Sequence, residues 1–125
     1  MAAASFGRTT RALHWIMAAG ILATLALGAT IARMEPGRAN LGLYGLHKTA
    51  GVSLLGLALL RLAWHRLHPP PGPLPGPPPW QMALARATHR ALYLLMLAVP
   101  LSGWAYASAT GLDVVVFGRY VLPPV

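Results

Sequence analysis

The residues best suited to chemistry in this chain are its five histidines, at positions 14, 47, 65, 68 and 89. Cysteine is absent, which excludes disulfides, iron–sulfur clusters on thiolates and the C-x-x-C-H attachment of a c-type haem. A neutral imidazole is a good ligand for iron through one ring nitrogen. The composition therefore favours chemistry at histidine, and haem held between helices is the leading form of it.

The elements that must position these histidines are long apolar segments. Of the 125 residues, 56% are hydrophobic and only 10% are charged, and the mean hydropathy is +0.55. A soluble domain carries about a quarter charged residues. Residues 13–31 hold no charge and are long enough to cross the roughly 30 Å hydrocarbon core of a bilayer. We therefore predict an all-α membrane protein, one domain over residues 1–125, with spans near 12–32, 46–64 and 88–108.

A secretory signal peptide is the competing interpretation of the first apolar run, because Arg8 and Arg11 precede it. The apolar regions of signal peptides are shorter, roughly 7–15 residues. The His14-Trp15 pair would also be unusual in a leader that is removed. A retained helix is therefore favoured.

Three polar or irregular segments connect or follow the spans. The connection at residues 33–38 contains Pro36 and Gly37, which break helices. Residues 69–79 read PPPGPLPGPPP and predict an extended, semi-rigid connector, with a ligand for a proline-recognition domain as the alternative. Residues 111–125 are too short to span and are expected along the membrane interface or against the helix ends.

Basic residues predict both the partners and the orientation. The formal net charge of +8 comes from residues at the ends of apolar runs, without a basic stripe that interleaves with aromatics. Lipid headgroups are therefore the expected partners, and nucleic acid is not. Six arginines fall on one predicted side, which the positive-inside rule makes cytoplasmic together with the N-terminus and the 69–79 loop. They are Arg8, Arg11, Arg61, Arg66, Arg86 and Arg90, against Arg33, Arg38, Lys48 and Arg119 on the other side.

His14 and His47 lie just inside the starts of the first two predicted spans. An ionisable group at membrane depth is a functional-site candidate by default. Gly51, one turn after His47, would let a flat ring approach the backbone. From the residues alone, both histidines are candidate ligands for haem iron, with pairing to lipid headgroups as the alternative for His14.

His89 lies one helical turn before Tyr93, near the start of the third span. It should share the cytoplasmic leaflet with His14, because alternate helices run in opposite directions. A cofactor contact, a quinone contact and an interhelical hydrogen bond all remain open for it. His65 and His68 flank Arg66 in a predicted interfacial basic cluster, and Arg61 is expected to extend toward the membrane surface.

Short motifs occur in a fixed order along the whole chain. RALHW at residues 11–15 and HKTAG at 47–51 surround the first two candidate ligands. RLAW at 61–64, with HPP at 68–70, closes the second span, and ARATHRALY at 85–93 opens the third. PLSG at 100–103, VFG at 116–118 and LPP at 122–124 follow. Together these motifs resemble the bacterial cytochrome b561 family of dihaem membrane proteins.

The resemblance implies an up-and-down four-helix bundle with two b-type haems, one toward each face of the bacterial inner membrane. It assigns one axial ligand each to His14 and His47. In the family, two histidines of a fourth helix oppose them, and this chain ends in the loop before that helix. We therefore expect three helices of the bundle here, with the fourth lost by truncation or supplied by another chain, or fewer haems than in relatives.

The function implied is electron transfer, with electrons entering at one face, passing from haem to haem and leaving at the other. Quinone is the expected partner, or a reduced oxygen species such as superoxide, and the sequence leaves open whether the complete protein is a carrier or an oxidoreductase. Two alternatives remain. One is a haem-free membrane scaffold or assembly subunit whose histidines form interhelical hydrogen bonds. The other is the cytochrome b subunit of a larger dehydrogenase or hydrogenase.

Overall fold

The computed structural model of the chain describes residues 7–35, 37–69, 72, 75–111, 114–117 and 119–124, without the side chain of Tyr120. The elements in chain order are α1 (Arg8–Ala32), the short 3-10 turn η1 (Arg38–Asn40), α2 (Leu41–Leu67), α3 (Pro79–Ala109), β1 (Val114–Val116) and β2 (Tyr120–Leu122). Within this described part, three helices are long and apolar enough to cross a membrane. The predicted all-α membrane fold is therefore confirmed, and a small β-hairpin is added to it.

Two hydroxyl groups of α1 are satisfied within the helix, as a lipid environment requires. The hydroxyl groups of Thr24 and Thr30 in α1 donate to backbone carbonyls four residues earlier, at 2.7 and 2.8 Å. Such bonds leave no hydroxyl donor unpaired in hydrocarbon. Helix α3 begins at Pro79, where a missing N–H costs nothing, and it continues through Pro100. All three helices are longer than the spans expected from the sequence.

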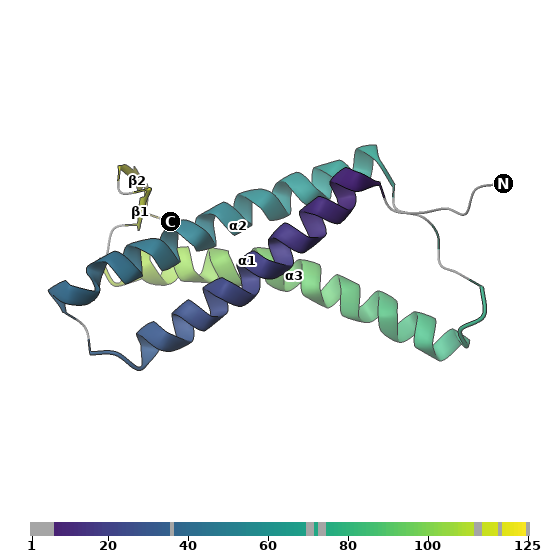
Figure 1. Cartoon of the computed structure of the whole chain (residues 1–125), viewed down its shortest axis with the longest axis horizontal. Coiled ribbons are helices and arrows are strands. Elements are labelled where there is room, and N and C mark those ends of the chain that lie inside the picture. The colour runs from purple at the N-terminus through teal and green to yellow at the C-terminus, as the bar shows by residue number, and fades with distance from the viewer. Residues whose placement is uncertain are drawn as a thin grey trace.

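Helix α2 packs against both α1 and α3 (Figure 1). Its pairing with α1 is antiparallel, because contacts step down α1 as they step up α2. Trp64 Nε1 donates to Thr10 Oγ1 at 2.9 Å near one end. In the middle, a Cβ atom placed on Gly20 would be 2.9 Å from Leu54 Cδ2. These contacts fix which residue of α1 faces each turn of α2.

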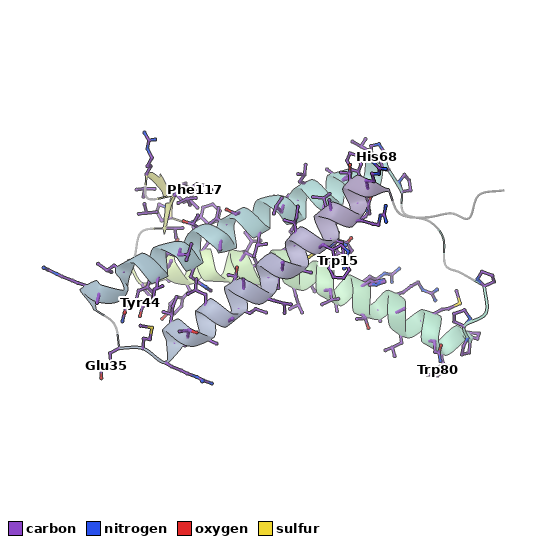
Figure 2. All side chains as sticks on the ribbon, in the orientation of Figure 1. Trp15, Glu35, Tyr44, His68, Trp80 and Phe117 are labelled. Carbon is purple, nitrogen blue, oxygen red and sulfur yellow. The ribbon has the colours of Figure 1, made fainter. Side chains whose placement is uncertain are left out.

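Helix α3 diverges from the other two helices at its N-terminal end (Figure 1). Trp80, in its first turn, and His68, just after α2, lie far apart in Figure 2. Of the expected 69–79 connector between them, Pro70, Pro71, Pro73 and Leu74 lie outside the described residues. The connector's remaining residues up to Pro78 are neither helix nor strand.

Strands β1 and β2 form an antiparallel hairpin in which Val114 pairs with Leu122 and Val116 with Tyr120. The hairpin packs against α2 and α3, and Val114 and Val116 form a small buried cluster with Ala107 of α3. Trp104 Nε1 of α3 also donates to the Pro123 carbonyl at 3.0 Å. The expected interfacial segment 111–125 thus folds back onto the helices over its described part; Leu112, Asp113, Gly118 and Val125 lie outside that part.

Most large apolar side chains of the helices point outward, as the sticks of Figure 2 show. Examples are Leu22 at 68% exposure, Leu94 at 67% and Leu60 at 55%. In water such surfaces would be unstable, whereas lipid tails solvate them at no cost. The exposure pattern agrees with a multi-pass membrane protein.

Candidate functional site

His47 is held in the seam between α1 and α2. It lies in the first two turns of α2, and its ring is directed at the backbone of Gly28 in α1. A Cβ atom on residue 28 would be 2.8 Å from Cε1 of the ring and 3.4 Å from Nδ1. Only glycine therefore leaves room for the imidazole in this position.

The buried ring nitrogen of His47 lacks a hydrogen-bond partner. Its Nδ1 is enclosed, and no donor or acceptor from the described residues reaches it. A buried polar atom without a partner costs about 1–3 kcal/mol and calls for an explanation such as a ligand. Because the ring is fixed in place with an unmet polar atom, His47 is a candidate ligand; Nδ1 of His65 is likewise buried without a partner among the described residues.

His14 lies in the first two turns of α1, at the opposite end of the same seam. Its side chain is exposed and meets Trp15 edge to face, with ring centroids 5.0 Å apart. Arg61 Nη2 of α2 lies 3.5 Å from His14 Nδ1. A guanidinium only donates hydrogen bonds, so a hydrogen bond between the two groups requires the lone pair of Nδ1 and a ring proton on Nε2.

Arg61 connects all three helices. Its Nε donates to His65 Nε2 at 3.4 Å, and its Cζ lies 5.5 Å from the centroid of the Tyr93 ring in α3. His65 and Tyr93 also meet edge to face at 6.3 Å. We call His14, Arg61, His65 and Tyr93 the Arg61 cluster. The side chain of Arg61 is half-buried in this cluster.

This grouping was not predicted, although the sequence carries part of the signal for it. Arg61 and His65 are four residues apart and therefore share one face of α2. Antiparallel pairing of two spans of similar length also places the end of α2 beside the start of α1. The two patterns combined bring Arg61 to the level of His14, but they do not show which face of α2 is turned toward α1.

The two predicted iron ligands cannot serve one metal. Fourteen residues of α1 separate His14 from Gly28, the residue that faces His47. At 1.5 Å per residue the two levels are about 21 Å apart along the helix pair. The structure therefore holds two separate histidine positions, one toward each end of the bundle.

The structure does not place His89 beside His14. It is exposed on α3, in the half of the helix that diverges from α1, and it has no hydrogen bond or ring contact with the described part of the chain. His68 instead stacks on Trp64, with ring centroids 3.9 Å apart. Neither residue adds to a shared site in this structure.

The donor set fits a haem better than a free metal ion. Among the described residues, no three or more His, Cys, Asp or Glu side chains gather where they could hold an ion. Haem iron, in contrast, takes its equatorial nitrogens from the porphyrin and needs only axial ligands from protein. Single, separated histidines in apolar surroundings therefore suit haem.

A small cavity of about 170 Å³ lies beside the His47 turn. Its lining is Leu41, Tyr44, Gly45 and Lys48 of α2 and Val115 of the hairpin. Pockets for cofactors and drug-sized ligands usually measure about 300–1,000 Å³. The cavity is thus no cofactor pocket.

Comparison with known proteins bears on these histidines. A family model described as prokaryotic cytochrome b561 matches residues 5–123. Cytochrome b561 homolog 2 of Escherichia coli (strain K12) is 35% identical over 122 residues, which are 94% of this chain and 63% of the relative. Cytochrome b561 homolog 1 of the same organism is 32% identical over 107 residues, 85% of this chain and 61% of the relative.

A third relative is named for an activity. The probable superoxide oxidase CybB of Yersinia pestis is 32% identical over 73 residues, 58% of this chain and 42% of the relative. The chain spans less than two thirds of the length of all three relatives. The family match covers both histidine positions and all three helices, and its members are b-type haem proteins. The chain therefore belongs to the prokaryotic cytochrome b561 family.

Proposed function

We propose that this chain carries electrons within the membrane, with His14 and His47 as axial ligands of b-type haem iron. The observation that carries the proposal is their placement at opposite ends of one antiparallel helix pair, about 21 Å apart along the axis. That placement suits a relay with one carrier toward each face of the membrane. Family membership supports the same cofactor.

Bound haem would supply a one-electron carrier at each level. His47 is oriented for ligation before any cofactor arrives, because the backbone of Gly28 limits rotation of its ring. His14 is oriented by its edge-to-face contact with Trp15. Hydrocarbon around the helices lowers the local dielectric and so strengthens the effect of nearby charge on the reduction potential.

The opposing axial ligands are proposed to come from a fourth helix, either a further segment of a longer protein or part of another chain. The three helices leave apolar surface for it, since Leu94 and Leu95 of α3 are 67% and 51% exposed. Two haems are proposed for the completed bundle. The N-terminus is proposed to face the cytoplasm across the bacterial inner membrane, in agreement with the distribution of arginines.

The electron partner is proposed to be a quinone dissolved in the membrane. His89 is exposed on α3 and is the candidate for contact with it. The relative named as a probable superoxide oxidase supports a second candidate partner, superoxide at an outer face. A substitution of His89 that retained haem but slowed reduction by quinol would support the first.

The test is a visible spectrum and a pyridine haemochrome count on the complete protein, purified from haem-supplied cells. His14→Ala and His47→Ala are each expected to remove one of two reducible α-band components. His68→Ala is the matched control, because His68 is exposed and stacks on Trp64 outside both positions. Unchanged haem content in both ligand variants would refute the proposal, and a wild type without any reducible band would favour the scaffold alternative.

A further inference from the structure

We propose that Arg61 sets the reduction potential of the haem bound through His14. The inference rests on the proposed function, because it takes His14 as an axial ligand. Its basis is that one guanidinium contacts His14 of α1, His65 of α2 and Tyr93 of α3. Arg61 would be a positioning residue, acting on the iron through charge and through the His14 ring.

The contact with His14 has a chemical consequence. In the structure, His14 Nδ1 must offer a lone pair, since Arg61 has no acceptor. Iron bound at Nε2 needs the lone pair there and so leaves the proton of the neutral ring on Nδ1. Nδ1 cannot carry a proton and offer a lone pair to Arg61 at the same time. Ligation through Nε2 therefore breaks the hydrogen bond between Arg61 and His14.

Arg61 would not leave the site when that bond breaks. Its Nε still donates to His65 Nε2 at 3.4 Å, and its Cζ stays over the Tyr93 ring at 5.5 Å. Cation–π contact with tyrosine is strongest where water is scarce. His65 and Tyr93 thus keep a fixed positive charge next to the His14 ring.

No carboxylate of the described residues neutralises this charge. Of the two acids in the chain, Glu35 follows the far end of α1, and Asp113 lies outside the described residues. Figure 2 shows Glu35 at the opposite end of the helix pair from His68. Arg61 lies in the last two turns of α2, which end just before His68. An uncompensated cation at low dielectric favours the reduced iron, which carries one positive charge fewer.

The experiment is a redox titration of the complete, haem-loaded protein, followed at the α-band. Arg61→Gln is expected to lower the reduction equilibrium constant of one component by about tenfold, which is 59 mV for one electron. Arg61→Lys, which keeps the charge but not the planar contact, should shift it less. Arg66→Gln is the matched control, since it removes the same charge from an exposed position one turn further along α2. It should leave both components unchanged.

A second pair of variants covers the case in which Arg61→Gln fails to retain haem. Tyr93→Leu removes the ring that holds the guanidinium, and Tyr93→Phe keeps it. The leucine variant should lower the same potential and the phenylalanine variant should not. Equal potentials in this pair, or an unshifted potential in a haem-retaining Arg61→Gln variant, would overturn the inference.

The outcomes separate this inference from the proposed function. If His14→Ala leaves both haems in place, the ligand assignment fails first. If His14→Ala removes one haem and the Arg61 and Tyr93 variants leave its potential unmoved, only the role of Arg61 is wrong.

Discussion

The imidazole of His47 lies against the backbone of Gly28, so closely that a Cβ atom on residue 28 would approach Cε1 of the ring to 2.8 Å. Contacts under 3 Å are essentially never seen at real Cβ atoms, so any side chain at position 28 requires movement. The atom that must move belongs to a stiff ring on a packed helix. The orientation of a predicted haem ligand therefore depends on a glycine in the neighbouring helix.

Gly28→Ala is the first prediction. The added methyl group should displace the His47 ring, at a cost of about 1–3 kcal/mol as for other overpacked interiors. We expect a lower content or a shifted spectrum of one haem component, measured by pyridine haemochrome and low-temperature absorption. A haem content and spectrum equal to those of the wild type would contradict the role given to Gly28.

Two other glycines provide controls for that substitution. At Gly20 the added Cβ would be 2.9 Å from Leu54 Cδ2, the free end of a flexible side chain that can turn away. At the exposed Gly56 it would meet no atom within 4 Å. Both Gly20→Ala and Gly56→Ala should keep the full haem content. Gly56→Ala should also stabilise α2, by about 0.5–1 kcal/mol.

The second prediction concerns the hydrogen bond between Trp64 Nε1 and Thr10 Oγ1, at 2.9 Å. It joins the start of α1 to the end of α2, beside the Arg61 cluster. Interhelical hydrogen bonds in membrane proteins average about 0.6 kcal/mol in double-mutant cycles. Trp64→Phe, Thr10→Val and the double variant, unfolded in mixed micelles, should give a coupling energy of that size. A coupling energy of zero would show that the bond adds nothing to the helix pairing.

The helices could be predicted from the sequence because their lengths and compositions leave few alternatives. Residues 13–31 contain no charge, and the prolines between residues 69 and 79 separate the second and third helices. The candidate ligands His14 and His47 stood out for the same reason, as polar rings in apolar segments. The sequence alone thus predicts which segments are long and apolar enough to cross a membrane.

The sequence does not predict how each helix is rotated about its own axis, that is, which of its faces meets a neighbouring helix. In water, the polar face of a helix identifies its outer side. In lipid both faces are apolar, so the sequence of α2 does not reveal which of its sides meets α1. That is why the contact of Arg61 with His14 and the packing of His47 on Gly28 were not predicted. The three-residue strands β1 and β2 are also shorter than the runs of four to eight residues that predict strands.

A third prediction tests the attachment of the hairpin. The backbone N–H of Phe117, at φ 55°, donates to Thr49 Oγ1 of α2 at 3.1 Å. Thr49→Val keeps the shape of the side chain and removes the acceptor, so the amide of residue 117 should exchange with solvent faster. Thr49→Ser retains the hydroxyl and should restore the slow exchange. Equal exchange in all three proteins would mean that the bond does not hold the hairpin.

The fourth prediction follows from the separation of the two histidine positions. Substitutions more than 7–10 Å apart without shared partners usually act independently. The levels of His14 and His47 are about 21 Å apart, and no described residue is in contact with both the Arg61 cluster and the Gly28–His47 pair. Combining His14→Ala with Gly28→Ala should therefore remove one spectral component and disturb the other, each as in the single variant. If instead His14→Ala alone altered the spectrum of both components, the two positions would belong to one coupled site, and the arrangement of one carrier toward each face would be wrong.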